Sequence, residues 1–319
     1  MGTLADLISS TLVFSVALIF AALGGVFSER SGVFNIGLEG MMTAGAFGAA
    51  IASYYMETDG GATTSSPWVG LVAGIVCGFV FALLHAYATV SLKADQTIVG
   101  VVINILAVAV TLYLVKIIFE GAGDTAQLKN VFAKWPIPLL SDIPFLGRAF
   151  FNSYPTTYIA YILVPLSSYL LFKTPFGLRL RSVGEHPGAA DTVGINVTKY
   201  RYIGVLISGA LAGLGGATIT LTTTSNFSHS TISGQGFIAI AALIFGRWNP
   251  YGVFGAAFFF GMAQALRNFL TRFEFSQSIP TEFLYMLPYI LTLIVLAGAV
   301  GKSVRGPAAA GEAYDPSKR

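Results

Sequence analysis

Few residues of this chain have the types and spacing that covalent or metal chemistry requires. The three histidines, His85, His186 and His229, are far apart and lack the spacing of metal ligands, so no metal site is predicted. The single cysteine, Cys77, lies in an apolar run, which excludes a disulfide within the chain. Neither a nucleophile elbow nor a carboxylate pair at catalytic spacing is present. The residues therefore do not predict an enzyme.

The motif GKS at Gly301–Ser303 resembles the end of a phosphate-binding loop. That loop requires a glycine five residues before Gly301, where this chain has Leu296. The motif also follows an apolar run, whereas a phosphate-binding loop links a strand to a helix. We therefore expect the chain to bind no cofactor, so that ATP and Mg²⁺ in any ATP-driven process would belong to a separate ATPase.

Polar side chains within apolar runs are the remaining candidates for chemistry. Such residues are costly in a membrane unless they face protein or water, so they are candidates for a solute path. For each amide the alternative is hydrogen bonding between helices. For the carboxylate the alternative is a structural role near a helix N-terminus, where the helix dipole favours an acid. The candidates are Glu39, Asn104, Gln235 and Gln264.

The composition indicates the environment in which these residues act. The chain has 319 residues, of which 55% are hydrophobic and only 10% are charged, and its mean hydropathy is +0.73. Soluble globular proteins have about 25% charged residues. The first apolar run is preceded by Asp6 and no basic residue, so we do not interpret it as a cleaved signal peptide. The chain is predicted to be a polytopic membrane protein.

The apolar runs predict an all-α protein with about nine transmembrane helices, since each needs about 20 residues to cross the bilayer. One of them, 236–246, is short. It is either a compact crossing or a re-entrant half-helix, which is tolerated only where it is buried in protein. The predicted spans are 7–27, 35–55, 68–90, 98–118, 157–173, 201–222, 236–246, 251–270 and 281–300.

The distribution of Lys and Arg predicts the orientation of these spans. The loop 174–200 and the tail 301–319 are basic and are assigned to the cytoplasm, whereas METDGGATTSSPW, residues 56–68, has no basic residue and is assigned outside. This places the N-terminus outside and the C-terminus inside. Glu29 and Arg30 then lie at the inner end of the first span, where we expect hydrated interfacial anchors.

Two segments outside the spans have distinctive compositions. The connection 119–156 contains Trp135 and several prolines, and we expect an ordered external cap with short interfacial helices. The tail 301–319 is rich in Gly, Pro and Ala and is predicted to be disordered. Residues 1–300 are therefore expected to form one transmembrane domain.

The loop 174–200 begins with Pro175 and Gly177, which we interpret as helix breakers. A short helix is predicted from about Pro187 to Val193, with proline at its start and Gly194 after its end. Two interpretations remain for this short helix on a basic loop. It is either a capped surface turn or an element that docks into a groove of a soluble partner.

Two motifs resemble those of a known family. The stretch GEHPGAADTVGIN, residues 184–196, is followed by Lys199 and the small-residue run SGALAGLGGA. It resembles the permease subunits of ABC importers of the ribose and branched-chain amino-acid superfamily. The stretch RSGVFNIGLEGMM, residues 30–42, is similar to the early motif of the branch that imports nucleosides and simple sugars. The resemblance covers nearly the whole chain, including GFIAIAALIFGRWNPYGV.

The resemblance implies an ABC importer permease fold and a role in ATP-dependent import of nucleosides or related simple sugars. It implies a bacterial cytoplasmic membrane location, surrounding lipid, an ABC ATPase, a second homologous permease and an extracytoplasmic substrate-binding (lipo)protein, with no nucleic-acid partner. Amide side chains suit such a solute, because they pair with nucleobase edges and ribose hydroxyls. The implied ATPase-coupling residues are Gly184, Glu185, Pro187, Ala189, Ala190, Asp191, Gly194 and Ile195.

Other classes of function make different predictions. A secondary transporter or channel would move a small polar solute without an ATPase. Glu39 is the one plausible interior carboxylate, which argues against proton coupling. A membrane scaffold would leave the polar residues within the spans unexplained. The small residues Gly209, Gly213 and Ala217 are interpreted as a helix-packing surface.

Overall fold

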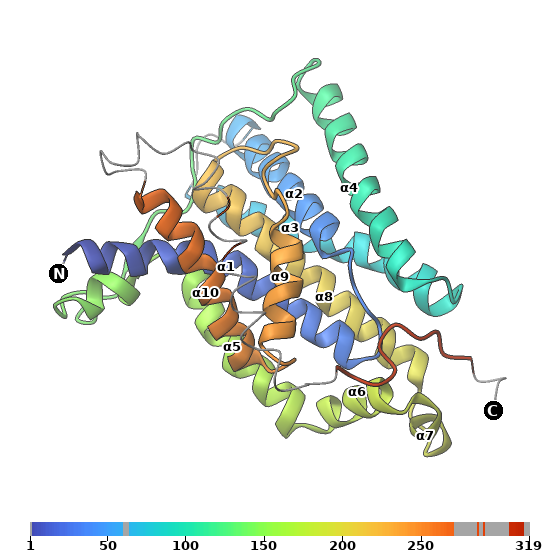
Figure 1. Ribbon diagram of the computed structural model, residues 1–319. Coiled ribbons are helices and arrows are strands. Elements are labelled where there is room, and N and C mark those ends of the chain that lie inside the picture. The colour runs from blue at the N-terminus through green and yellow to red at the C-terminus, as the bar shows by residue number, and fades with distance from the viewer. Residues whose placement is uncertain (1, 60–63, 271–285, 287–289, 291–305, 316–319) are drawn as a thin grey trace.

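The computed structural model describes residues 2–59, 64–270, 286, 290 and 306–315, which form a bundle of helices (Figure 1). This confirms the predicted all-α class. Of three short π-helical turns (η), η1 and η3 extend α3 and α8, whereas η2 directly precedes β2, which pairs antiparallel with β1. The elements are α1 (Gly2–Arg30), α2 (Leu38–Asp59), α3 (Ser66–Ala86), η1 (Tyr87–Ser91), α4 (Gln96–Ile118), β1 (Trp135–Pro136), η2 (Gly147–Phe151), β2 (Asn152–Ser153), α5 (Pro155–Lys173), α6 (Pro175–Glu185), α7 (Pro187–Thr192), α8 (Val197–Ile219), η3 (Thr220–Thr224), α9 (Gln235–Phe245) and α10 (Pro250–Leu270).

Each predicted span that falls on described residues is a helix, and its ends lie within a few residues of those expected. The predicted span 281–300 lies outside the described residues. The short span corresponds to α9, which has 11 residues. Five helices of the described part are both long enough and apolar enough to cross a membrane: Leu4–Arg30, Ser66–Ser91, Gln96–Ile118, Pro155–Lys173 and Val197–Thr224.

Burial distinguishes the centre of the bundle from its edge. In α1 and α8, 72% of the most apolar 18-residue stretch is buried, compared with 28% of the corresponding stretch in α4. Ile98, Ile105 and Tyr113 of α4 are each 65% exposed, and α4 stands at one side of the bundle (Figure 1). A helix that is apolar all round and half exposed is suited to a lipid environment. The exposed apolar surface of α4 is therefore suited to contact with lipid.

The predicted small-residue surface of α8 packs directly against neighbouring backbones. A Cβ added at Gly209 would collide with Ala82 of α3, and one added at Gly213 would collide with the carbonyl oxygen of Gly74. A Cβ at Gly45 of α2 would likewise collide with Gly213. The prediction of close helix packing is thus confirmed. In lipid, such small residues let helices approach closely and gain dispersion energy.

Contacts between distant segments define two ends of the bundle. At the first, which we call the cap end, Arg148 forms an ion pair with Asp6 at 2.9 Å. At the second, the tail end, Lys93 pairs with Asp315 at 3.0 Å, and α6 and α7 lie close by (Figure 1). The N-terminus and the connection 119–156 therefore lie at one end, and the basic loop and tail lie at the other.

The connection 119–156 at the cap end was expected to contain short interfacial helices, and its short regular pieces are η2 and the β1–β2 pair. Its first part runs alongside η3 and the residues that follow η3, with the N–H of Thr125 donating to the Phe227 carbonyl and that of Phe132 to the Leu221 carbonyl, both at 2.9 Å. Both oxygens of Glu57 on α2 accept backbone N–H groups of residues 129–130, each at 2.9 Å. The connection is thus fastened across the cap ends of α2 and α8.

Candidate functional site

The segment 225–248 runs between the two ends of the bundle and is helical over only part of its length. After η3, Ser225 has a left-handed backbone (φ 59°), and residues 225–234 contain no helix. The 11 residues of α9 then span roughly 16 Å, about half of the thickness of the hydrocarbon core. Because the chain following α9 reaches the tail end, the N-terminus of α9 lies in the interior of the bundle.

Glu39 of α2 caps this interior N-terminus. Its Oε1 accepts a hydrogen bond from the N–H of Gly234, and its Oε2 accepts one from the N–H of Gly236, both at 2.6 Å. The first N–H groups of a helix have no acceptor within the helix, and Gly234, which precedes α9, has no side chain with which to cap it. Glu39 was predicted to act at the start of its own helix. In the structure it also neutralises the start of a second one.

The approach of α2 and α9 depends on a missing side chain. A Cβ added at Gly236 would lie 2.5 Å from both the backbone nitrogen and the Cα of Glu39. Such distances do not occur between real atoms, so the two helix starts could not meet with any other residue at position 236. Two helix N-termini, each with a partial positive charge, therefore converge on one carboxylate.

Asn104 of α4 joins the same region. Its Oδ1 accepts a hydrogen bond from the Gly40 N–H at 2.7 Å, and its Nδ2 donates to the Ile36 carbonyl at 3.1 Å. The donor and acceptor of this amide are thus both bonded to the backbone at the start of α2. This is the interhelical hydrogen bonding considered as the alternative for each amide.

Gln235, the first residue of α9, is half-buried beside this cap. It lines a cavity of about 30 Å³ between α1, α8 and η3, to which Thr218, Thr222 and Thr223 also contribute. Val13, Phe14 and Ala17 of α1 form the apolar side of this cavity, which has room for about one water molecule. In this conformation there is no room for a larger solute at Gln235.

The structure therefore brings together three of the four predicted interior residues: Glu39, Asn104 and Gln235. The fourth, Gln264, is half-buried on α10. Its amide makes no hydrogen bond among the residues that the structure describes. Within that part of the chain, Gln264 also has no hydrogen bond that links it to Glu39, Asn104 or Gln235.

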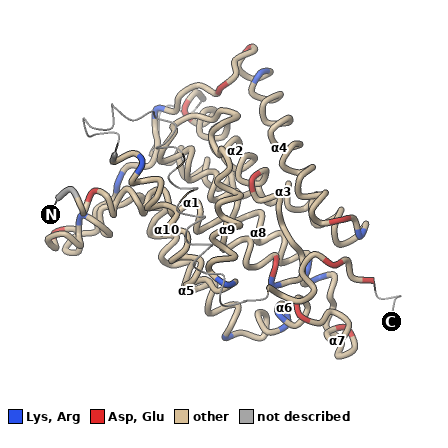
Figure 2. Tube along the Cα trace, viewed as in Figure 1, with Lys and Arg blue, Asp and Glu red and all other residues tan. Residues whose placement is uncertain are grey.

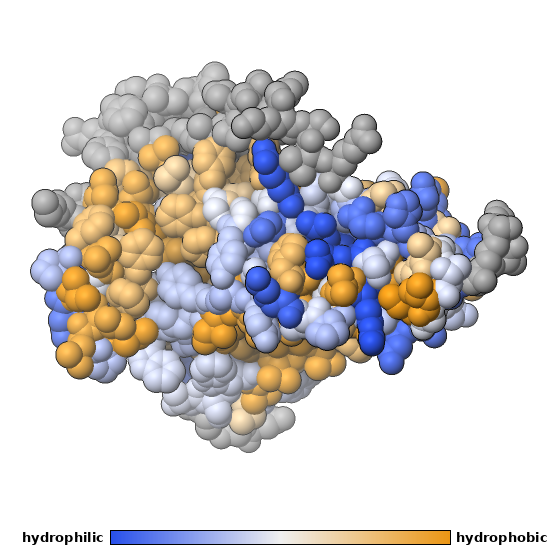
Figure 3. All heavy atoms as spheres, turned by 90° about the horizontal axis from the view of Figure 1, so that it is seen from below, coloured by the Kyte–Doolittle hydropathy of each residue, from blue (hydrophilic) through white to orange (hydrophobic). Residues whose placement is uncertain are grey.

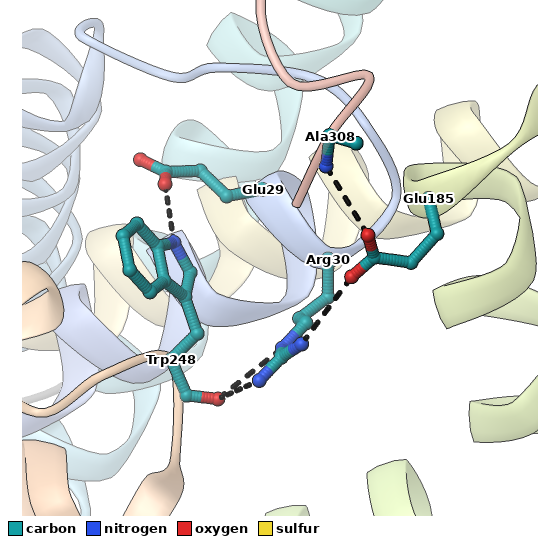
Figure 4. Close-up of polar contacts among 5 residues, drawn as sticks. All are labelled: Glu29, Arg30, Glu185, Trp248 and Ala308. Carbon is teal, nitrogen blue, oxygen red and sulfur yellow. Dashed lines mark hydrogen bonds and ion pairs between the residues drawn. The ribbon is translucent and has the colours of Figure 1, made fainter. Parts of the chain in front are cut away.

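The end of α1 corrects a prediction from the sequence. Glu29 is only 3% exposed, and its Oε2 accepts a hydrogen bond from Nε1 of Trp248 at 2.5 Å (Figure 4). The expectation of a hydrated anchor at Glu29 was wrong, because the turn between α9 and α10 folds over the end of α1 and excludes water. The indole ring that follows α9 is thus fixed to α1.

Arg30 continues this contact toward the next helix (Figure 4). Its Nε and Nη2 donate to the Trp248 carbonyl at 3.4 and 3.3 Å, and its Nη1 lies 3.9 Å from Oε1 of Glu185. The guanidinium also lies over the ring of Phe172, 5.8 Å from its centre. Arg30 is therefore half-buried among α1, α5, α6 and the α9–α10 turn, and is more than an interfacial anchor.

The basic loop contains two helices, although the sequence predicted one. The predicted helix is α7, and the chain leaves it through Gly194 with φ +83°. Of the two predicted breakers, Pro175 does mark a break, because α5 ends at Lys173 and Thr174 is extended before α6 begins, whereas Gly177 lies inside α6 and the interpretation was wrong there. Pro175 occupies the first turn of α6, where its missing N–H costs nothing, and Thr174 caps the N–H of Gly177 at 3.2 Å.

The residues predicted to couple to an ATPase have different environments. Gly184 is buried against the end of α1, where an added Cβ would collide with the Arg30 carbonyl. Ala190 is also buried, whereas Ala189, Gly194 and Glu185 are exposed, and Pro187, Asp191 and Ile195 are half-buried. Some of the predicted residues therefore form an exposed surface, and the buried ones pack beneath it.

The exposed surface around α7 combines apolar and basic side chains. Val193 is 74% exposed and Leu178 of α6 is 62% exposed. Lys and Arg gather around α6 and α7 together with acidic residues (Figure 2). Seen from below, the molecule has hydrophilic side chains next to isolated hydrophobic ones (Figure 3). An open groove of about 350 Å³ lies beside α7, lined by Asp191, Gly194, Ile195, Asn196, Val197, Thr198 and Tyr314.

Part of the tail was predicted to be disordered and is folded in the structure. Residues 306–315 lie across the tail end, and the N–H of Ala309 donates to the Gly184 carbonyl at 2.9 Å. The Tyr314 hydroxyl donates to Oδ2 of Asp191 at 2.8 Å. Composition failed here because specific contacts, and not a hydrophobic pattern, fix this segment.

The comparison with known families determines the family of this helix bundle. The family described as branched-chain amino acid transport system / permease component matches residues 7–296. The chain belongs to this family. It is a multi-pass membrane permease subunit, a transport component and not an enzyme, and the resemblance in the sequence motifs is confirmed.

Curated relatives of the permease match over nearly its full length. Guanosine ABC transporter permease protein NupQ of Bacillus subtilis is 50% identical over 317 residues, covering 99% of this chain and 98% of the relative. Nucleoside ABC transporter permease protein NupC of Lactococcus lactis is 44% identical, covering 99% of each chain. A putative glucose ABC transporter permease protein, TsgC13 of Haloferax volcanii, is 35% identical, covering 84% and 78% respectively.

Several residues of the permease site were missed from the sequence. Trp248 could have been noticed as an indole in a polar turn directly after a short span. Thr222 and Thr223 belong to a hydroxyl-rich run after α8, which also signals a polar interior. Tyr314 had no sequence signal, because nothing local indicates its contact with Asp191.

Proposed function

We propose that this permease is the membrane-spanning subunit of an ATP-dependent importer of nucleosides. The observation that carries the proposal is the match of NupQ and NupC across 99% of the chain, since both are named as permeases for guanosine or nucleosides. The likeness to TsgC13 keeps simple sugars as the second candidate solute.

We propose that the tail end faces the cytoplasm and the cap end faces outside. The excess of Lys and Arg at the tail end supports this orientation. With about nine crossings, the N-terminus is then external and the C-terminus cytoplasmic. The segment 225–248 counts as one of these crossings, because its two ends contact opposite ends of the bundle. Its non-helical half is tolerated because it is enclosed by protein.

In this proposal α7 is the coupling helix and docks into a groove of an ABC ATPase that holds ATP and Mg²⁺. The exposed Val193 and Leu178 offer the apolar contact that such an interface centre requires. The surrounding basic residues favour an acidic rim on the ATPase. Gly184 and Ala190 are the buried support of this surface.

The solute path is proposed to pass the N-terminus of α9. Glu39, Asn104 and Gln235 lie there together, and Gln264 of α10 is a further candidate with a less supported position. The small cavity at Gln235 suits a closed state. ATP-driven movement of α7 would alternate the side from which this region is open. A second homologous permease and an extracytoplasmic binding protein complete the importer, and the binding protein supplies much of the selectivity.

The test is uptake of radiolabelled guanosine, adenosine and ribose by cells that express the permease with its neighbouring transport genes. We expect nucleoside uptake that requires an intact ATPase, and copurification of that ATPase with the permease. Uptake driven by an ion gradient in the absence of an ATPase would instead establish a stand-alone secondary transporter or channel. Uptake of ribose without uptake of either nucleoside would refute nucleosides as the solute.

A further inference from the structure

The folded tail segment 306–315 contacts both the proposed coupling helix and the connector between α1 and α2. We call residues 31–37 the connector. On the α6–α7 side, the N–H of Ala309 donates to the Gly184 carbonyl, and the Tyr314 hydroxyl donates to the Asp191 carboxylate. The N–H of Ala308 also donates to Oε2 of Glu185 at 3.3 Å. The segment is thus bonded to the C-terminal end of α6 and to α7.

On its other side the segment is bonded to α4 and α8. The carbonyl of Glu312 accepts hydrogen bonds from Nη1 of Arg201 at 2.7 Å and from Nε2 of Gln96 at 3.4 Å. Arg201 is 1% exposed and Gln96 is 2% exposed. A single tail carbonyl is therefore held by two buried side chains from different helices.

Gln96 extends this contact to the connector. Its Oε1 accepts a hydrogen bond from the Phe34 N–H at 2.6 Å. The side-chain amide of Gln96 is therefore hydrogen-bonded to the tail through its nitrogen and to the connector through its oxygen. Near the start of the connector, Gly32 has φ +89°, and an added Cβ would lie 3.0 Å from Nη2 of Arg201 and 3.5 Å from the Ala309 carbonyl oxygen. The connector thus lies against the tail and the side chains that hold it.

The connector leads directly to the interior cap. Only Leu38 separates its end from Glu39, whose carboxylate holds the N-terminus of α9. Within the connector, Nδ2 of Asn35 donates to Oγ of Ser208 on α8 at 3.0 Å. A displacement of the connector therefore changes the position of the carboxylate on which two helix starts converge.

We propose that the segment 306–315 is a strap that transmits displacement of α7 to the connector, and through it to the Glu39–α9 cap. The positioning residues are Tyr314, which bonds the segment to Asp191 of α7, and Gln96, which bonds the Glu312 carbonyl of the segment on one side and the connector on the other. This inference rests on the proposed function of α7 as the coupling helix. The polar chain consists of Asp191, Tyr314, the Glu312 carbonyl, Gln96 and the Phe34 N–H, and it supplies the contiguous network through which two sites are coupled.

The test uses the whole transporter, with its ATPase, partner permease and binding protein, in lipid vesicles. Guanosine uptake and ATP hydrolysis are both measured per assembled complex. We expect Tyr314→Phe and Gln96→Leu each to lower guanosine imported per ATP hydrolysed by about fivefold, the lower end of typical coupling between sites. The double variant Asp191→Ala/Tyr314→Phe is expected to lower this ratio no further than the more impaired of the two single variants. Both changes remove the same hydrogen bond, between Tyr314 and Asp191.

Tyr202→Phe is the matched control. Its hydroxyl is bonded to Oγ of Ser91 at 2.5 Å, at the same end of the bundle but outside the strap. It is expected to leave the ratio of uptake to hydrolysis unchanged. An unchanged ratio in Tyr314→Phe, or an equal loss in Tyr202→Phe, would overturn the strap. Failure of the unmodified complex to import guanosine with ATP would instead refute the proposed function.

Discussion

The carboxylate of Glu39 accepts a hydrogen bond from the backbone N–H of Gly234, 195 positions later in the chain. This bond, with its partner from Gly236, joins the start of α2 to the start of α9 in the interior of the bundle. It explains why an acid stands at the head of an apolar helix. The acid completes a second helix that has no capping side chain of its own.

Replacing Glu39 by Gln should destabilise this junction. One carboxylate oxygen becomes an NH₂ group, which then faces a backbone N–H and leaves a buried donor without an acceptor. Such a loss costs about 1–3 kcal/mol. The midpoint of chemical unfolding in detergent measures it. Glu120→Gln, at an exposed position, is the control and should leave the midpoint unchanged, and equal midpoints for both variants would contradict the cap.

Gly236→Ala should prevent normal packing of α9. The new Cβ would lie 2.5 Å from backbone atoms of Glu39, so the two helix starts must separate. Fluorescence-detected size-exclusion chromatography should show a severalfold lower yield of folded protein. Gly255→Ala is a matched change in α10, where no atom of the residues that the structure describes lies within 4 Å of the added Cβ. That variant should fold at least as well as the original chain, since alanine favours helix.

Trp248→Phe should weaken the contact between the α9–α10 turn and α1. It removes the Nε1–H donor and leaves the buried Glu29 carboxylate without that partner, at a cost of about 1–3 kcal/mol. Thermal unfolding of the purified protein measures the change. Trp135→Phe alters an indole that is 61% exposed and should have little effect. Similar losses in the two variants would show that the hydrogen bond to Glu29 contributes little.

Val193→Asp should impair docking of the ATPase without harming the fold. The side chain is 74% exposed, so the change disrupts no internal packing. A carboxylate there would be buried on docking and would repel the expected acidic rim. We expect at least about tenfold weaker binding of the ATPase, equivalent to about 1.4 kcal/mol, in a pull-down titration. Leu139→Asp introduces the same charge at an 84% exposed position of the cap end, and binding should be unaffected there.

Prediction from the sequence succeeded where the signal was local. Apolar runs of membrane-spanning length gave helices, and the proline and glycine around α7 marked its limits. The small residues of α8 were correctly interpreted as packing surface. These features depend on properties of neighbouring residues, which the sequence displays directly.

Prediction failed where contacts join distant segments. Glu29 was expected to be hydrated, because its burial depends on Trp248 in a different turn. The tail was expected to be disordered, because its order depends on Gly184, Asp191 and Arg201. At Glu39 the residue was recognised as structural, but the helix that it completes could not be identified from sequence spacing.

The backbone contacts of α8 with α2 and α3 have a consequence for motion. Helices that meet through glycines have no intervening side chains whose rotamers could adjust, so sliding would drive carbonyl groups into one another. We therefore expect α2, α3 and α8 to move as one rigid slab. The start of α9 is hydrogen-bonded to that slab through the Glu39 carboxylate, and Gly236 lies directly against the Glu39 backbone. Any rotation of α9 relative to the slab must therefore either keep these two hydrogen bonds as its pivot or break them.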